Sequence, residues 1–264
     1  MPFETRLVDL VFPGETNHHG TLFGGAALAY MDKLAYIVAT RHALTDFVTA
    51  SCDRIDFSAP AHLGEIVEVT GRPVRAGRRS LTVETDLVAE DPKTGARRLC
   101  TRGRFNMVAV DAAHTVPPLP EPPPVSDAPV DPYQPLRMVE LVFPDQCSHR
   151  QVLFGGYAQS VMGKAAFVAA TRLCRKAVVM GASQGTEFVA PVRVGEIIEI
   201  TAQVTAVGRT SMTVEVSVAG ENLLSGERRL GARGSYTMVA VDEDGRPCPA
   251  LDPRPASPPA PAGP

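Results

Sequence analysis

The sequence predicts an α+β protein built from two copies of one unit, in which a curved antiparallel sheet wraps a long central helix. The first observation behind this prediction is that short motifs recur at a constant offset of 131 positions, such as FGG at 23–25 and 154–156 and MVAVD at 107–111 and 238–242. The second is that each copy holds one long helix-forming segment, followed by segments in which Val, Ile and Thr alternate with other residues, as in antiparallel strands. We therefore interpret the chain as an internal duplication.

Each copy begins with a short apolar strand, LVDLVFP at 7–13 and MVELVFP at 138–144, which leads into a polar loop. The next segment, GGAALAYMDKLAYIVATRHA at 24–43, carries apolar residues nearly all the way round, which predicts a helix surrounded by protein. Alternating segments follow in the first copy as EIVEVTGRPV, RSLTVETDLVAE and RLCTRGRFNMVAVD. Turn residues in DPKTG and GENLLSG predict hairpins between strands.

A single unit of this kind would leave the edges of its sheet and part of its helix uncovered. Two fused units can pair edge to edge and pack their helices against each other, which removes both problems. We therefore expect one continuous sheet across the two copies, with the two helices packed antiparallel.

This organisation divides the chain into four segments. Residues 1–115 form the first domain and residues 136–245 the second, with a Pro-rich linker at 116–135 between them. Such a linker is extended and fairly stiff. Residues 246–264 are rich in Pro and poor in large apolar residues, which predicts a disordered tail.

The composition excludes several classes of function. The chain has 264 residues, 44% of them hydrophobic, and a formal net charge of −3, so no overall positive field attracts nucleic acid or an anionic membrane. No apolar run is long enough for a transmembrane helix, and no signal peptide is evident. The five cysteines lack zinc-ligand spacing, which predicts reduced thiols in a cytoplasmic protein without a metal site.

A set of motifs in a fixed order resembles a known family. Asn-x-x-Gly-x-x-Phe-Gly-Gly at 17–25 leads into a helix containing Met-Asp, and DRIDF, GRRS and MVAVD follow. This order is similar to that of the hotdog-fold acyl-CoA thioester hydrolases, and the duplication resembles their cytosolic type with two tandem hotdog domains. The resemblance implies a fatty acyl-CoA substrate, a site at the domain interface, and three double hotdogs around a threefold axis. It also implies that an Asn at position 17 and an acid at position 32 serve one site from different domains.

The two Gly-Gly pairs are candidate oxyanion donors. The first N–H groups of a helix have no partner inside the helix and lie at the positive end of its dipole. Gly24, Gly25, Gly155 and Gly156 carry no side chains, so a thioester carbonyl could approach these amides closely. The alternative interpretation is that the glycines only allow a tight turn or a close contact between helix and sheet.

Asp32 is the candidate base, because a carboxylate on an otherwise apolar helix is desolvated and accepts a proton readily. The alternative is a structural acid that caps a loop or pairs with a cation such as Lys33. We expect Lys33 and Lys164 to form ion pairs or to extend into solvent. The second copy holds Gly163 at the equivalent position, and Ser148 in place of Asn17.

If the two helices pack antiparallel, Asp32 faces the start of the second helix and Asn17 faces Gly163. One composite site then has an acid and the other has none. We expect hydrolysis at the first, with the amides of Gly155 and Gly156 as donors and with Ser148 or His149 orienting water. Asn17 then serves a site that is inert or binds acyl-CoA without cleaving it, and the equivalent His18 and His149 are weaker candidates than the acid.

Arg78 and Arg209 occupy equivalent hairpin positions beside glycines and are candidates for binding the phosphates of coenzyme A, although solvated turn arginines would fit equally well. Coenzyme A is part of the substrate, and we expect no other cofactor. Two further functions stay open from the sequence. One is acyl-CoA binding without catalysis, and the other is a hotdog enoyl-CoA hydratase.

Overall fold

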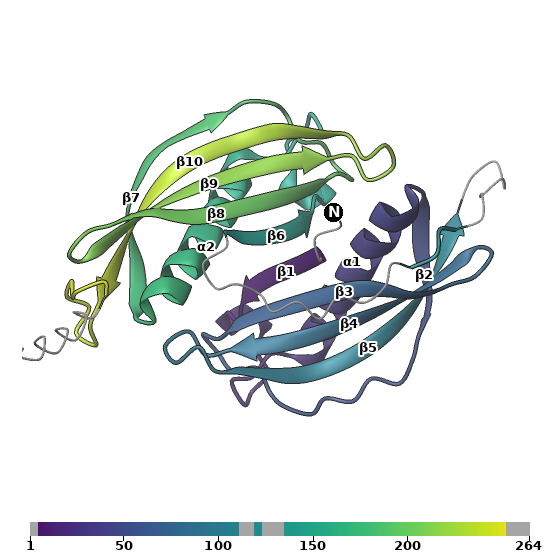
Figure 1. The fold of residues 1–264 in the computed structure, drawn as a ribbon, viewed down its shortest axis with the longest axis horizontal. Helices are drawn as coiled ribbons and strands as arrows, with labels where there is room; N and C mark the ends of the chain where they lie inside the picture. The colour runs from purple at the N-terminus through teal and green to yellow at the C-terminus, as the bar shows by residue number, and fades with distance from the viewer. Residues whose placement is uncertain (1–4, 111–118, 123–134, 252–264) are drawn as a thin grey trace, which may run out of the picture.

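The computed structural model describes residues 5–110, 119–122 and 135–251. Each half begins with a strand and a short 3-10 helix, continues with a long helix, and ends with a meander of strands (Figure 1). The elements of the first half are β1 (Thr5–Leu10), η1 (Pro13–Glu15), α1 (Gly24–Ala43), β2 (Asp46–Cys52), β3 (Ile66–Ala76), β4 (Ser80–Glu90) and β5 (Arg97–Val110). Those of the second half are β6 (Leu136–Leu141), η2 (Pro144–Gln146), α2 (Gly155–Cys174), β7 (Ala177–Phe188), β8 (Ile197–Val207), β9 (Ser211–Glu221) and β10 (Arg228–Val241).

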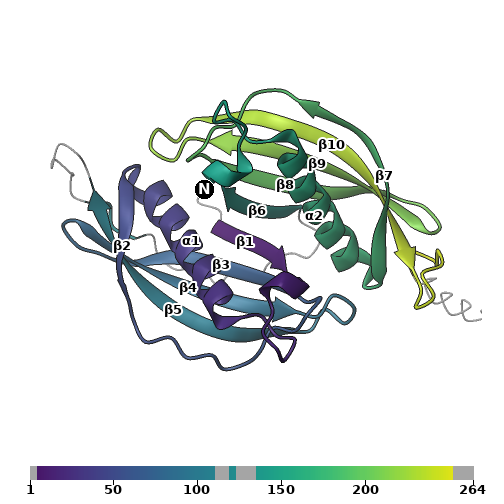
Figure 2. The same ribbon diagram turned by 180° about the vertical axis from the view of Figure 1, so that it is seen from behind.

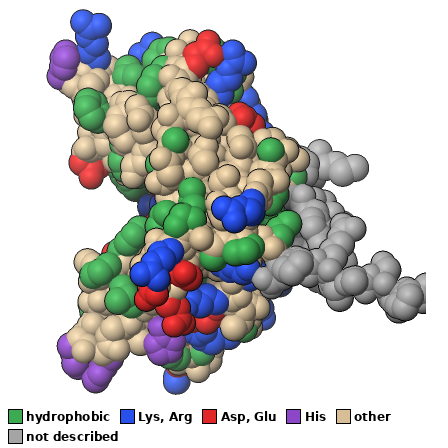
Figure 3. Space-filling model, turned by 90° about the vertical axis from the view of Figure 1, so that its left-hand side faces the viewer, with side chains coloured by type: hydrophobic (Ala, Val, Ile, Leu, Met, Phe, Trp, Pro, Cys, Tyr) green, Lys and Arg blue, Asp and Glu red, His purple; other side chains and the backbone are tan. Residues whose placement is uncertain are grey.

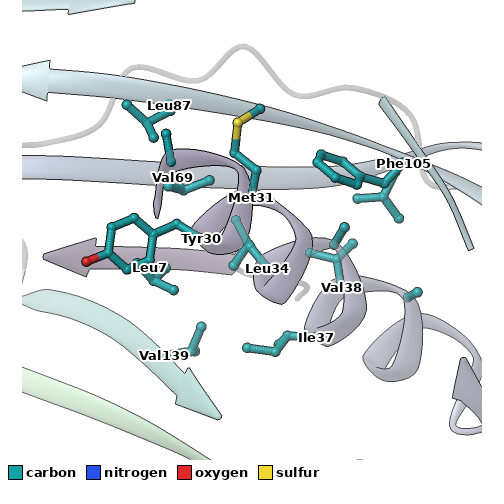
Figure 4. Packing of buried hydrophobic residues seen from close by; sticks show 14 of the residues in the cluster. Leu7, Tyr30, Met31, Leu34, Ile37, Val38, Val69, Leu87, Phe105 and Val139 are labelled. Carbon is teal, nitrogen blue, oxygen red and sulfur yellow. The ribbon is translucent and has the colours of Figure 1, made fainter. Parts of the chain in front are cut away.

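Two five-stranded antiparallel sheets form the framework, with the strand orders β1-β3-β4-β5-β2 and β6-β8-β9-β10-β7. Each sheet curls around its own helix, so the core of each half lies between helix and sheet (Figure 4). Met31 and Leu34 of α1 are fully buried against strand residues such as Val69. The predicted pair of helix-centred units, the hotdog architecture, is therefore confirmed.

The two halves meet along a contact that we call the seam, where β1 and β6 lie side by side between the two helices (Figure 2). The expectation of one continuous sheet was wrong, because the described residues form two separate sheets. Ion-paired side chains lie at this junction instead, as Lys164 Nζ lies 2.9 Å from a carboxylate oxygen of Asp9. The expected direct packing of α1 on α2 is likewise replaced by contact through β1 and β6.

Reciprocal ion clusters join the halves at the far ends of the helices. Arg172 of α2 lies 2.7 Å from both Glu68 and Glu90 of the first sheet. Arg41 of α1 in turn lies 2.7 Å from Glu221 and 3.1 Å from Glu199 of the second sheet. Burial opposes the ionisation of Glu68, but the guanidinium groups around it outweigh burial and lower its pKa to about 2. The lysines of both helices are also in ion pairs, as predicted, with Lys33 3.5 Å from Glu140.

The two outer edges of the molecule, β2 and β7, lie at opposite ends, and neither has a second neighbouring strand among the described residues (Figure 1). Large apolar side chains are exposed there, including Val48 at 50% in β2 and Met180 at 47% in β7. The end of the molecule that carries β7 shows such hydrophobic side chains on its surface (Figure 3). Both edges are long stretches without charge, from 47 to 52 and from 177 to 186.

The linker and the tail are described only in part. Residues 119–122 belong to the predicted linker, and Leu119 packs into the first core. The rest of the linker and residues 252–264 lie outside the described residues. The tail prediction was wrong for 246–251, because Ala250 is fully buried and its amide donates to the carbonyl of Arg209. Composition alone missed this segment because a few small apolar residues are enough to cover a strand end.

Candidate active site

The starts of the two helices present unpaired amides. The residues before them, Phe23 and Phe154, are extended, and neither helix has a side-chain cap. Among the described residues no acceptor is recorded for the amides of Gly155 and Gly156. These N–H groups therefore remain available to an oxyanion at the positive end of the helix dipole.

Aromatic rings explain why these positions are glycine. A Cβ atom added to Gly25 would lie 2.6 Å from the ring of Phe23, and one added to Gly155 would lie 3.3 Å from the ring of Phe188. Close contacts therefore exist at Gly25 and Gly155, and the role of the Gly-Gly pairs as oxyanion donors stays a prediction.

Asp32 is held by a residue that the sequence analysis did not single out. The hydroxyl of Thr49 on β2 donates to a carboxylate oxygen of Asp32 at 2.6 Å. Asp32 is half-buried, not fully buried as expected, and no described cation lies within ion-pair distance of it. The carboxylate is thus oriented by a neutral donor, and its predicted role as a base stays a prediction. The sequence feature that could have pointed to Thr49 is its place on the strand that directly follows the helix.

The second half has lost both members of this pair. Gly163 replaces the acid, and Met180 replaces Thr49. A Cβ atom added to Gly163 would lie 2.8 Å from the terminal methyl of Met180. The space for an acid in the second half is therefore filled by an apolar side chain.

Asp32 points away from the second half of its own chain. Lys33, Ile37 and Arg41 form the stripe of α1 that faces the seam. At 3.6 residues per turn, Asp32 lies roughly 100° to 180° round the helix from that stripe. Its partner Thr49 lies on β2, at the edge of the sheet farthest from β1 and the seam. The expectation that Asp32 faces the start of α2 within one chain therefore does not hold.

Asn17 and Ser148 close equivalent loops. The side-chain oxygen of Asn17 accepts from the amides of His19 and Thr21, and its nitrogen donates to the hydroxyl of Thr21. Ser148 accepts from the amide of Arg150 at 3.3 Å. Both residues shape the turn before the Gly-Gly pair, which is a structural role. Their predicted roles at the thioester stay predictions.

The remaining candidates lie on the surface. His18 and His149 are exposed, and the ring of His18 lies 3.8 Å from that of His19. Arg78 and Arg209 are exposed in the β3–β4 and β8–β9 hairpins, close to where β2 and β7 begin. Because α1 is about 30 Å long, Arg78 and the start of α1 cannot serve one site within the same half. A role of these arginines at the phosphates of coenzyme A stays a prediction.

The described residues hold neither a metal-binding cluster nor a membrane-spanning helix. No group of three or more His, Cys, Asp or Glu side chains has an arrangement that could hold a metal ion. In the same residues, neither long helix is apolar enough to span a membrane.

Comparisons with known proteins agree on one family. The model of the thioesterase superfamily matches residues 19–96 and again residues 150–224. The cytosolic acyl coenzyme A thioester hydrolase of Homo sapiens is 24% identical, with 91% of this chain and 76% of that protein covered. The protein of the same name from Rattus norvegicus is 23% identical, over 90% of this chain and 74% of its own length. A crystal structure of an acyl-CoA hydrolase from Agrobacterium tumefaciens has 51% identity and a TM-score of 0.84, and it covers 94% of this chain and 98% of that one.

Proposed function

The chain belongs to the thioesterase superfamily, and from this membership we propose that it hydrolyses fatty acyl-CoA to the free acid and coenzyme A. The observation that carries the proposal is that the two halves supply different chemical groups. The first half supplies a carboxylate fixed by Thr49, and the second supplies unpaired amides at the start of α2. The names of the curated relatives support a cytosolic location.

These groups suffice for thioester hydrolysis. Asp32 takes a proton from a water molecule, and the resulting hydroxide attacks the thioester carbonyl. The amides of Gly155 and Gly156 stabilise the oxyanion that forms on the carbonyl oxygen. When the carbon–sulfur bond breaks, the thiolate of coenzyme A leaves and accepts the proton from Asp32. No covalent enzyme intermediate is needed, because a thioester is activated more than an amide or an oxygen ester.

The site is completed by a second copy of the chain. Asp32 and Thr49 lie at the β2 edge, and the start of α2 lies beside Phe188 at the end of β7. Apart from Asp46 at the start of β2 and Glu187 near the end of β7, both edges are uncharged and carry exposed apolar side chains, which are the properties of strands that pair with another chain. Pairing β2 of one copy with β7 of the next brings the acid to the donors.

Contact between β2 of one copy and β7 of the next is heterologous, because it joins two different surfaces. Each copy therefore has one edge available at each end. Such contacts form a ring when the rotation closes. We place three copies in the ring, as the resemblance to tandem hotdog hydrolases implies. A sizing measurement should then give three times the 28.1 kDa mass of one chain.

Release of free thiol from a panel of acyl-CoAs tests the activity. The wild type should release thiol, and Asp32→Asn should lower kcat by about 10²–10⁴-fold, the usual effect of losing a general base. The carboxamide keeps the size of the side chain and the hydrogen bond from Thr49, so folding should be preserved. Equal kcat values for the two proteins would remove Asp32 from the mechanism.

A second candidate function is acyl-CoA binding without cleavage. It is favoured by one observation, that the position of the acid in the second half is filled by Met180. We assign this behaviour to the site that combines Asn17 with Gly163. If neither the wild type nor Asp32→Asn releases thiol while both bind acyl-CoA, binding is the function of the whole protein.

A further inference from the structure

A cavity of about 340 Å³ opens beside the start of α2. Its lining is almost entirely apolar and includes Gly155, Ala158, Phe188, Val192, Val218 and Gly231. Gly155, whose amide is a proposed oxyanion donor, forms part of the wall. An acyl carbonyl placed at this amide would therefore have an apolar space directly beside it.

The equivalent positions of the first half hold larger side chains. Leu87 stands where the second half has Val218, Cys100 where it has Gly231, and Thr101 where it has Ala232. All three first-half residues are almost completely buried. The hydroxyl of Thr101 also donates to the carbonyl of Asp56 at 3.0 Å, so this wall includes a polar group that already has a hydrogen-bond partner.

Val192 and Val189 reverse this trend, because the first half has Ala61 and Ser58 at the equivalent positions. A Cβ atom added to Gly231 would lie 2.9 Å from a methyl group of Val192. Val192 and Gly231 therefore form a matched pair, as Ala61 and Cys100 do in the first half. Each pair fits its own half and clashes or leaves a void when only one member is exchanged.

We propose that this cavity binds the acyl chain of the substrate and that Gly231, with Val218 and Ala232, sets how long that chain can be. The inference rests on the proposed function. It assigns to one composite site both parts that hydrolysis of a fatty acyl thioester needs: the acid from the first half of one copy and the chain pocket from the second half of the next. The other composite site has no acid at the equivalent position, and Leu87, Cys100 and Thr101 stand where this cavity has Val218, Gly231 and Ala232.

Two wall residues of the first half, transferred to the second half, test the inference. Val218→Leu with Ala232→Thr adds three non-hydrogen atoms to the wall and installs residues that the first half already accommodates, so the variant should fold. We expect kcat/KM for dodecanoyl-CoA to fall by about 10–200-fold, the usual effect of losing apolar space of this order, while kcat/KM for acetyl-CoA stays the same. The matched control is Leu87→Val with Thr101→Ala, which should leave the chain-length profile unchanged.

A binding measurement separates the inference from the proposed function. The probe is the non-hydrolysable dodecyl thioether of coenzyme A, titrated by calorimetry. If the wild type releases no thiol but binds this probe at least tenfold more tightly than the exchanged variant, the pocket assignment is supported and the proposed hydrolysis is contradicted. If both proteins release thiol with the same chain-length profile, or bind the probe equally, the pocket assignment is overturned.

Discussion

In the first half Asp32 and Thr49 form a hydrogen-bonded pair, whereas the equivalent positions of the second half hold Gly163 and Met180 in van der Waals proximity. Beside the helix start the difference runs the other way, because the second half has an open apolar cavity lined by Gly231 where the first half has Cys100. Each half therefore presents a different part of the proposed site.

The comparison shows how a duplicated fold can diverge without losing its framework. Strand order, helix length and the seam ion pairs are common to both halves. These features depend on many residues at once, so single substitutions do not remove them. The acid and the pocket each depend on a few side chains, and these changed in compensating pairs.

After loss of the acid, the largest expected effect is at the start of α2. Gly155→Pro removes one proposed donor. Pro suits the first helical position after an extended residue, and its Cβ would lie 3.3 Å from the ring of Phe188, which must shift by a few tenths of an ångström. We expect kcat to fall by about 10²–10³-fold, as for other oxyanion donors. Gly24→Pro makes the same change in the first half and should leave kcat near the wild-type value. A similar loss in both variants would mean that the halves contribute equally.

The two ion clusters that join the halves should contribute unequally to the stability of the fold. Because the pKa of Glu68 is lower in the folded protein than its ordinary 4.5, ionised Glu68 stabilises the fold above that pH, and the contribution is lost as the pH falls toward about 2. The contribution is on the order of 3 kcal/mol. Urea denaturation at pH 7 should show a larger loss for Glu68→Gln than for the equivalent Glu199→Gln, whose side chain is more exposed. Equal losses would show that burial does not distinguish the two clusters.

A smaller effect is expected at the residue that holds the acid. Thr49→Val keeps the shape of the side chain but removes the hydrogen bond to Asp32. Since hydrogen bonds to charged groups contribute about 1.5 kcal/mol or more, kcat should fall about tenfold with little change in KM. Met180→Leu at the equivalent position of the second half is the control. A rise in KM without a change in kcat would instead indicate that Thr49 contacts the substrate.

The smallest expected effect is a gain of function. Gly163→Asp alone should fail because Met180 occupies the space, whereas Gly163→Asp with Met180→Thr recreates the pair of the first half. The double variant should raise the rate about twofold with acetyl-CoA, since one more site per chain becomes competent. The gain should be absent with dodecanoyl-CoA, because Leu87, Cys100 and Thr101 still fill the first-half pocket. A gain of equal size with both substrates would contradict the assignment of the pocket.

The sequence was sufficient for the fold because the duplicated motifs and the alternating strands repeat over most of the chain. It also singled out Asp32 and the Gly-Gly pairs as candidates, which are visible as a charge in an apolar helix and as residues without side chains. It did not predict which edges of the two sheets meet, because all four edge strands, β1, β2, β6 and β7, carry apolar side chains that another strand could cover. Because the meeting edges were not known, the sequence analysis placed Asp32 toward the second half of its own chain, whereas the structure places it beside β2 on the other side of the helix. Thr49 and the cavity at Gly231 were missed for a related reason, since both depend on contacts between distant segments.

The central claim is that one active site is shared between two copies of the chain, and subunit mixing tests it most directly. Asp32→Asn and Gly155→Pro chains should each be nearly inactive alone. When they are co-expressed in equal amounts, contacts between unlike copies should restore about a quarter of the wild-type activity, because a quarter of the interfaces in a randomly mixed ring join an intact acid to an intact helix start. If the site lies within one chain, every site in the mixture carries a defect, and co-expression would restore no activity.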